Sequence, residues 1–283
     1  MTEKPQTAEI SWAVEEFGQV DLKDERLNFR CQELVETLGK QPSAPINQAC
    51  EDWADSKAAY RFVDNQKVTP GRILAPHSER TVERMIDHEI VLAIQDTTFL
   101  NYTHHPETQD LGEIGAKAQN QRGFGLHSTL AVTPSGQPLG ILTQAFLERA
   151  LGEPTHTPSE ARKQPIEEKE SYRWVQAFEK TIELSPAGVQ VVTVCDREAD
   201  LYEMFVVAQE RQASLLVRAD DDRCLQDDET KHLWAKVAQQ PVQGELSVHI
   251  TGNDQRKERE AVVSIRFCTI KLRPPWRPEK KKL

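Results

Sequence analysis

The sequence has no long apolar run. Of its 283 residues, 38% are hydrophobic and 28% are charged, and no apolar stretch approaches the ~20 residues that a bilayer-spanning helix needs. Residues 1–6 are polar and precede no apolar segment, so we expect no secretory signal. These absences argue against a membrane protein and predict a cytoplasmic one.

Cysteine is scarce, and its spacing excludes two common uses. The five cysteines form no C-x-x-C pair, and the eight histidines form no H-x-x-x-H pattern. An odd number of scattered cysteines fits free thiols in a reducing compartment. The same spacing argues against a disulfide framework and against a structural zinc site.

The net charge of −10 at pH 7 leaves no overall excess of positive charge. Taken alone, this total counts against a nucleic-acid partner, but a positive binding surface can be local and hidden in the total. Residues 271–283 hold six basic side chains against one acid. Such a run is typical of a solvated segment, and less often of a contact with nucleic acid.

Two strand-like runs each end in an aspartate. Residues 89–95 lead into Asp96, and residues 189–195 lead into Asp196; both runs are rich in Val and Ile, as buried strands are. Acids at the rim of adjacent strands would form a site for Mg²⁺ or Mn²⁺. The alternative is that each aspartate only caps the helix that follows it.

Helical periodicity predicts that residues 10–70 form a first, helical domain. The apolar residues of a helix over 24–38 recur at i, i+4, i+7 and i+11 (Leu27, Cys31, Leu34 and Leu38). Gly39 is expected to end this helix. A second helix is expected over residues 46–62, with an apolar face of Ala49, Trp53, Ala58 and Phe62.

Residues 71–220 are expected to form an α/β core. A helix over 70–87 precedes the strand into Asp96, and a loop over 102–125 leads into a hairpin of strands 126–132 and 139–146. A helix over 166–184, the strand into Asp196, a helix over 198–211 and a strand over 213–218 follow. In this β-β-β-α-β-α-β order the first and fourth strands lie side by side and parallel, which brings Asp96 near Asp196. The layout is a ribonuclease H-like mixed sheet.

Residues 221–283 form a third region. Residues 245–250 and 261–267 alternate in polarity around a turn at 252–254, which predicts two half-buried strands. We interpret this region as the start of a β-rich insertion.

Several segments, in this order along the chain, resemble insertion-sequence cut-and-paste transposases of the transposon-five type, in the DD(E) superfamily. They are 17–18 (FG), 22–26 (LKDER), 58–62 (AAYRF), 96–98 (DTT), 121–123 (QRG), 127–128 (HS), 167–171 (EEKES), 174 (W) and 195–200 (CDREAD). The set spans roughly residues 12–220, and the whole ordered set is far more specific than any one member.

The resemblance implies that Asp96 and Asp196 are the family's first two catalytic aspartates. They would hold two Mg²⁺ or Mn²⁺ ions about 4 Å apart, which clamp the attacking and leaving oxygens at phosphorus. Water would nick the transposon end, and the new 3′-hydroxyl would attack again, through a hairpin and finally into target DNA. Thr97 and Thr98 either position phosphates or serve only as β-branched strand residues.

The implied partner is double-stranded DNA at transposon ends, in a bacterial, nucleoid-associated protein. We expect Arg26, Arg30 and Arg61 to contact this DNA: the first two lie one turn apart on one helix, and Arg61 belongs to a segment that resembles the family's end-binding region. Alternatively, these arginines pair with acids such as Glu33, Asp55 or Asp64. A homodimer, or a heterodimer with an intact transposase, is also expected.

The chain departs from the family in one respect. The family's third carboxylate lies on a helix with a Y-x-x-R-W-x-I-E-like pattern, which is absent here. The late glutamates lie in expected strands, turns or the basic tail (Glu245, Glu258, Glu260 and Glu279), and the family pattern does not support Glu198 or Glu203. We therefore expect a truncated transposase with an incomplete two-ion site. The alternative is a catalytically inactive DNA-binding remnant or a dominant-negative partner of a full-length transposase.

Overall fold

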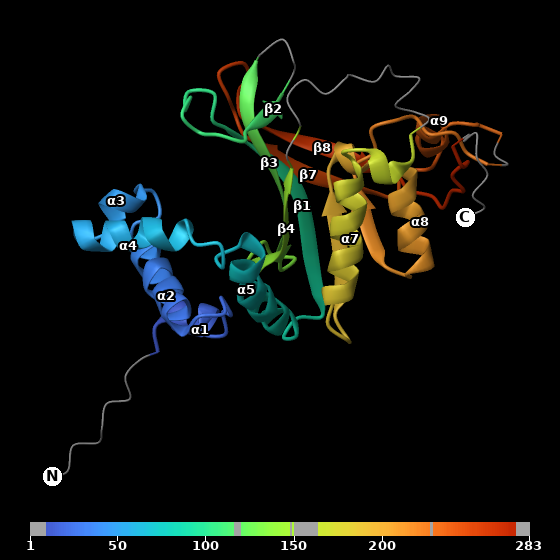
Figure 1. The fold of residues 1–283 in the computed structure, drawn as a ribbon. Helices are drawn as coiled ribbons and strands as arrows, with labels where there is room; N and C mark the ends of the chain where they lie inside the picture. Colours follow the sequence, from blue (N-terminus) through green and yellow to red (C-terminus); the bar gives the residue numbers. More distant parts are fainter. Residues whose placement is uncertain (1–9, 116–119, 148, 150–163, 227–228, 276–283) are drawn as a thin grey trace.

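The computed structural model describes residues 10–115, 120–147, 149, 164–226 and 229–275, arranged as Figure 1 shows. Within these residues, four helices lead through a fifth into a sheet with helices packed on it, and a β-hairpin follows. No helix of the described part is long and apolar enough to cross a membrane.

The described N-terminal residues are helical, as expected, but form four helices where the sequence predicted two. These are α1 (Trp12–Phe17), α2 (Glu25–Lys40), α3 (Ile46–Ala49) and α4 (Trp53–Val63). Helix α2 begins where the Asp24 carboxylate accepts a hydrogen bond from the backbone N–H of Arg26 at 3.1 Å, a favoured N-cap arrangement. Its apolar face joins a core made of Val20, Leu22, Cys31, Leu34, Cys50, Ala59 and Phe62.

Two details of this domain differ from the expectation. Helix α2 passes through Gly39, which makes room for the Trp12 ring: a Cβ on Gly39 would lie 2.4 Å from that ring. The second expected helix is two helices, because Asp52 leaves the helical path and caps α4 by accepting the Asp55 N–H at 2.9 Å. Trp53, expected on the buried face, is instead 75% exposed.

In the central sheet the strands that lead to Asp96 and Asp196 are adjacent and parallel, as expected. Its members are β1 (Ile90–Asn101), β2 (Gly112–Ile114), β3 (Gln121–Val132), β4 (Pro138–Leu147), β5 (Gln190–Cys195) and β6 (Ser214–Val217). The strands lie in the order β2-β3-β1-β5-β6, and β4 also pairs with β3. Strand β1 is antiparallel to β3 and parallel to β5, and β5 is parallel to β6. This is a ribonuclease H-like mixed sheet, so the predicted fold class is confirmed.

Some boundaries within the core differ from the prediction. The segment 102–125, expected as a loop, contains β2 and the first residues of β3, because residues 112–114 pair with residues 121–123. Helices α7 (Tyr172–Leu184) and α8 (Tyr202–Glu210) begin later than expected, since each follows a short 3₁₀ turn, η2 (Ile166–Glu168) and η3 (Arg197–Ala199) respectively.

Helices α5 (Pro70–Met85), α7 and α8 cover one face of the sheet. Met85 of α5 packs with Val91 and Ala93 of β1 in one buried cluster. In a second cluster, Trp174, Val175 and Phe178 of α7 and Met204 of α8 pack with Cys195, Leu215 and Val217. Figure 1 shows α7 and α8 side by side along the strands. These clusters form the core of the α/β domain.

The opposite face of the sheet carries the alternate side chains of the same strands, because successive strand residues point to opposite faces. Leu92, Ile94 and Asp96 of β1 lie on this face. Ile94 is 37% exposed, and Leu216 of β6 is 59% exposed. This face is therefore much less covered by described residues than the helix-packed one.

A group of charged side chains joins α1 to the core. The Glu16 carboxylate accepts two hydrogen bonds from the Arg84 guanidinium, at 2.8 and 2.9 Å, and lies 2.6 Å from Nδ1 of His77. Nε2 of His77 in turn accepts the backbone N–H of Ile141 at 2.9 Å. A Cβ on Gly140 would lie 2.1 Å from Oγ1 of Thr81, so glycine permits this close approach.

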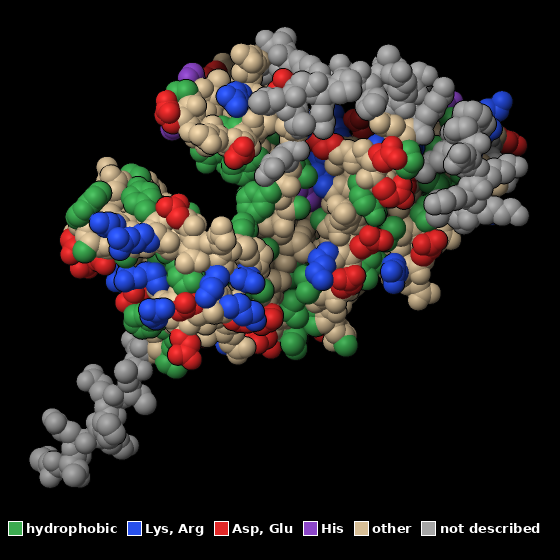
Figure 2. Space-filling view, viewed as in Figure 1, with side chains coloured by type: hydrophobic (Ala, Val, Ile, Leu, Met, Phe, Trp, Pro, Cys, Tyr) green, Lys and Arg blue, Asp and Glu red, His purple; other side chains and the backbone are tan. Residues whose placement is uncertain are grey.

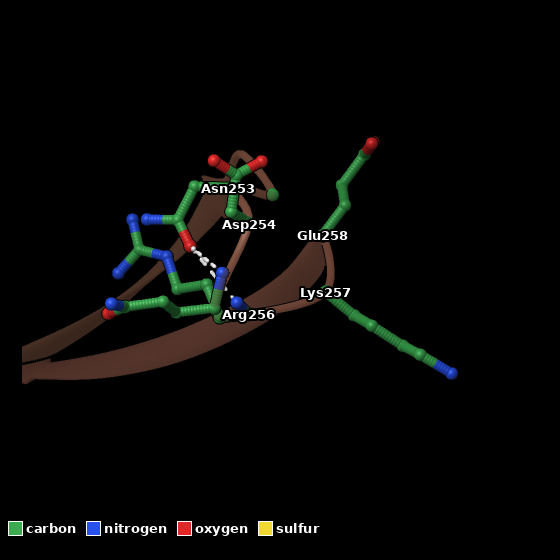
Figure 3. Close-up of a pocket in the computed structure, with 7 residues that line it drawn as sticks. Asn253, Asp254, Arg256, Lys257 and Glu258 are labelled. Atoms are coloured by element: carbon green, nitrogen blue, oxygen red, sulfur yellow. Dashed lines mark hydrogen bonds between the residues drawn. The ribbon is translucent and has the colours of Figure 1, made fainter.

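The C-terminal region contains α9 (Leu233–Ala238), β7 (Gly244–Ile250) and β8 (Arg259–Ile265). Strands β7 and β8 pair antiparallel, so the two strands predicted around a turn are confirmed. The residues of β7 and β8 are mostly exposed, however, so the prediction that these two strands are half-buried is wrong. At the tip, the Asn253 amide oxygen accepts the backbone N–H groups of Gln255 and Arg256, both at 3.0 Å. Figure 3 shows Lys257 and Glu258 pointing away from this turn, so their charges do not converge on a site.

Candidate metal and DNA-binding sites

Asp96 lies within β1 and not at its end. The strand continues to Asn101, and Asp96 sits opposite Ser128 of β3. The side chain of Asp96 is exposed, and within the described residues its carboxylate has no hydrogen-bond or salt-bridge partner. Since no helix follows Asp96 directly, the capping alternative is wrong for this residue.

Asp196 is the first residue after β5, as the sequence indicated. One of its carboxylate oxygens, Oδ1, accepts the backbone N–H of Glu198 at 2.9 Å, so Asp196 caps η3. Asp196 therefore does cap the turn that follows it. A carboxylate has two oxygens and several acceptor positions, which leaves Oδ2 available to a ligand.

The pairing of β1 with β5 relates the two aspartates. Every pair in this parallel ladder joins residue i to residue i+100, from Ile90 with Gln190 to Ile94 with Val194. Continued for two residues, the same register sets Asp96 opposite Asp196 on strands that lie ~4.8 Å apart. Among the described residues, no group of three or more His, Cys, Asp or Glu side chains is placed to hold a metal ion.

A buried arginine that the sequence reasoning did not select lies behind this pair. Arg173, near the start of α7, is 8% exposed. Its Nε donates to Oγ1 of Thr97 at 3.1 Å, and an NH2 nitrogen donates to the Glu198 carboxylate at 2.6 Å. Its spacing could have indicated this burial, because Arg173 lies four residues before Ala177, on the apolar face of the helix. Thr98, the neighbour of Thr97, is exposed.

His127 of β3 completes this polar group. Its Nδ1 lies 2.9 Å from Oγ1 of Thr97, and its ring meets the Trp174 ring edge-on with centroids 4.6 Å apart. Burial, and then the nearby Arg173 charge, lower the pKa of His127 to about 4. The imidazole is therefore neutral at pH 7. Because Thr97 already accepts from Arg173, its hydroxyl hydrogen is free to donate to Nδ1 of His127.

The three arginines selected for DNA contact differ in their pairing. The Arg26 side chain is 94% exposed and lies 3.6 Å from Asp24. Arg30 lies 3.3 Å from Glu33 and 3.8 Å from Asp55, so the ion-pair alternative is confirmed for it.

Arg61 of α4 is exposed and has no ion-pair partner among the described residues. The outward face of α4 adds groups that the sequence reasoning missed. Trp53, Lys57, Tyr60 and Arg61 are spaced at i, i+4, i+7 and i+8, which places them on one side of the helix. Trp53 is 75% exposed and Tyr60 is 47% exposed. Figure 2 shows Lys and Arg side chains over these N-terminal helices, interspersed with acidic and exposed hydrophobic ones.

Comparison with known proteins identifies the helical region. Residues 9–68 match a family model described as "Transposase DNA-binding". These residues form a transposase DNA-binding domain. The predicted DNA partner is thereby confirmed for this part of the chain.

Among solved structures, the chain is similar to a chain of the crystal structure of the Mos1 strand transfer complex. The TM-score is 0.25 and the identity 13%, and the match covers 66% of this chain and 57% of that one. The chain thus matches little more than half of that protein's length, and a likeness this distant supports no conclusion about function.

Within the transposase DNA-binding domain, aromatic and basic side chains alternate on the outward face of α4. Such a face suits DNA, because cations bind phosphates and exposed aromatic or amide groups contact sugars and bases. Arg30 already shares its NH1 nitrogen with Glu33 and Asp55, which compete with a phosphate for its charge. Arg61 and Lys57 of α4 have no such pairs among the described residues.

Proposed function

We propose that this chain binds transposon-end DNA through its transposase DNA-binding domain and carries, at Asp96 and Asp196, a divalent-cation site of the kind used in phosphoryl transfer. The observation that supports this proposal is the register of β1 and β5: continued for two residues beyond its last pair, Ile94 with Val194, it would set Asp96 opposite Asp196. The chain would thus supply the DNA-binding part and two metal-binding acids of an insertion-sequence transposase, whose cleavage and joining steps need a further carboxylate.

The donor set suits Mg²⁺ or Mn²⁺. Both carboxylates are exposed, and Mg²⁺ in proteins commonly uses one or two carboxylates while keeping several waters and substrate phosphates as ligands. When bound, divalent ions supply Lewis acidity and neutralise charge on the phosphoryl oxygens. The chain's own contribution is to hold Asp96 within a paired strand and to orient Asp196 through the Glu198 N–H.

We propose further that these residues alone do not cleave or join DNA. The family's mechanism requires a third carboxylate, and Glu198, the next acid after Asp196, is engaged with Arg173 at 2.6 Å. Thr97, the other partner of Arg173, lies on the helix-packed face of β1, opposite to the face of Asp96. With two carboxylates, a second ion is short of ligands.

A second candidate function follows from the missing third carboxylate. The chain would then be a DNA-binding protein without catalytic activity, acting as a remnant or as a dominant-negative partner of a full-length transposase. Only the helical domain is needed for this role. A homodimer, or a heterodimer with an intact transposase, is compatible with either candidate.

A nicking assay tests the catalytic part of the proposal. Purified chain is incubated with duplexes taken from the DNA on either side of its gene, in saturating Mg²⁺ or Mn²⁺, beside the Asp96→Ala variant as background. We expect no nicking above that background, because loss of one preorganised electrostatic group costs ~10²–10³ in rate. Nicking above background would show that two aspartates suffice or that another acid substitutes.

The same duplexes test the DNA-binding part. In fluorescence anisotropy at low salt, we expect the flanking duplexes to bind more tightly than a scrambled duplex of equal length. Equal affinity for both duplexes would contradict end recognition and leave only non-specific binding.

A further inference from the structure

We propose that Arg173 is a positioning residue that sets the spacing of the two metal-binding aspartates. This inference rests on the proposed cation site at Asp96 and Asp196. Arg173 touches neither aspartate in the described structure. It contacts instead the residue next to one of them and the residue that orients the other.

The first contact is to β1. Nε of Arg173 donates to Oγ1 of Thr97 at 3.1 Å, and Thr97 directly follows Asp96. Successive side chains of a strand point to opposite faces, so Thr97 faces the helices and Asp96 faces the other side. A hydrogen bond to Thr97 therefore restrains the backbone that carries Asp96. His127 restrains the same hydroxyl at 2.9 Å.

The second contact is to η3. An NH2 nitrogen of Arg173 donates to the Glu198 carboxylate at 2.6 Å. The backbone N–H of the same Glu198 donates to Oδ1 of Asp196 at 2.9 Å. Pulling Glu198 toward Arg173 therefore fixes the N–H group that orients the Asp196 carboxylate. One guanidinium thus connects the segments that carry both acids.

The guanidinium itself is held rigidly. Its NH1 nitrogen donates to the Glu170 carbonyl oxygen at 2.9 Å and lies 3.6 Å from the Glu170 carboxylate. That carboxylate also accepts two hydrogen bonds from Arg149, both at 2.9 Å. The Arg173 guanidinium further lies 5.7 Å from the centroid of the Trp174 ring. A planar fork fixed on several sides is suited to hold two groups at a set distance.

Groups behind metal ligands commonly change metal affinity 10–100-fold when they are removed. We therefore expect Arg173→Met to weaken Mn²⁺ binding by about tenfold. Arg173→Lys keeps the charge but replaces the fork with a single point charge, and should weaken binding by a similar amount. The matched control is Lys180→Met on the same helix, which removes an exposed cation whose partner is the equally exposed Glu183.

Two measurements on the full chain test the inference. Free Mn²⁺ is counted by electron paramagnetic resonance at a temperature well below the melting point of every variant, with Asp96→Asn and Asp196→Asn defining the site. Amide hydrogen exchange is followed by mass spectrometry in peptides that contain residues 92–100 and 193–201. If Arg173→Met does not fold, Glu198→Gln replaces it, since the Glu198 side chain is 56% exposed. For this variant we expect weaker Mn²⁺ binding and faster exchange in the 193–201 peptide alone, because Arg173 keeps its contact to Thr97.

The inference predicts weaker Mn²⁺ binding and faster exchange in both peptides for the Arg173 variants, with neither change in Lys180→Met. Unchanged Mn²⁺ affinity in the Arg173 variants would overturn it, even if their stability falls, because a role in packing alone does not alter the site. In the Arg173 variants, exchange that rises in only one peptide would also overturn it. Mn²⁺ binding that is insensitive to Asp96→Asn would instead refute the proposed cation site. In that case, unchanged exchange in the Arg173 variants would also refute the coupling through Arg173.

Discussion

Glu16 shows how a single residue joins the two parts of the molecule. Its carboxylate is bonded to Arg84 and lies against His77, and its side chain is only 15% exposed. The hydrogen bonds from Arg84, more than any other cause, lower the pKa of Glu16 below its ordinary value of 4.5. The folded protein therefore favours the ionised form more strongly than the unfolded chain does.

We expect Glu16→Gln to lower the free energy of unfolding by about 1.5–3 kcal/mol at pH 7, the usual contribution of a hydrogen bond to a charged group. Because the folded pKa is the lower one, the ionised carboxylate stabilises the protein above the unfolded pKa. That contribution is lost as the pH falls through the folded pKa. Urea unfolding at several pH values should show the difference between variant and wild type shrinking below about pH 5.

The control for this prediction is Glu83→Gln. Glu83 also pairs with an arginine, Arg80, at 2.6 Å, but its side chain is 58% exposed. Exposed pairs contribute about 0–1 kcal/mol, so this variant should be close to wild type. An equal loss in both variants would show that burial of Glu16 has no particular effect.

The cysteines differ in how reactive they should be. Burial raises the pKa of Cys31 to about 11, and burial together with the neighbouring Asp196 raises that of Cys195 to about 12. Cys224 is exposed, and Cys268 is half-buried. Since the thiolate is the nucleophile, we expect iodoacetamide at pH 8 to label Cys224 first and to spare Cys195 until the protein is unfolded. Early labelling of Cys195, read by peptide mass spectrometry, would contradict the described packing.

The residues that sequence reasoning misplaced share a physical cause. Trp53 has the spacing of a core residue, but the side of α4 that packs inward is the one that carries Ser56, Ala59 and Phe62. Arg173 has a charged side chain, so nothing in its type indicated burial. In both cases tertiary contacts decide the outcome, and those contacts are absent from local sequence patterns.

At the level of elements, α4 offers the most direct test of DNA contact. Arg61 and Lys57 are exposed and lack ion pairs among the described residues. Removing one cation that binds a phosphate should reduce the slope of log affinity against log salt by about 0.9. We expect Arg61→Ala and Lys57→Ala each to do so on end-sequence DNA, in fluorescence anisotropy titrations at several salt concentrations.

Two further variants test whether helix α2 also contacts DNA. Arg26→Ala should also reduce the slope if α2 shares in the contact, as the sequence predicted. Arg30→Ala should change it less, because Arg30 is already paired with Glu33 and Asp55. A slope unchanged by both Arg26→Ala and Arg61→Ala would contradict the assignment of these helices to DNA.

The strands show which parts of the fold the sequence predicts well. Runs of Val and Ile indicated the existence of β1 and β5, and their order along the chain indicated their adjacency, as the ladder confirms. The extension of β1 beyond Asp96 was missed, because residues 97–101 pair with β3 and not with β5. Strand pairing between distant segments determines where β1 ends, and the run of Val and Ile did not show it.

On the scale of the whole molecule, α5 connects the DNA-binding domain to the sheet. Ile73 near its start packs against the helical core, and Met85 at its end lies in the core under β1. Its 16 residues span ~24 Å at 1.5 Å per residue. Helix α5 thus packs into both cores. Together with the Glu16 contacts, it holds the DNA-binding domain in a defined position relative to Asp96.

The proposed chemistry as a whole depends on Asp96 and Asp196 sharing one cation. The most direct measurement is a crystal structure of the protein grown with Mn²⁺, with the ion located by its anomalous scattering. We expect a peak between the two strands, with carboxylate oxygens of both aspartates within about 2.0–2.6 Å of it. Carboxylates more than about 8 Å apart, too far to share an ion at such bond lengths, or an Mn²⁺ peak that involves neither aspartate, would contradict the shared site.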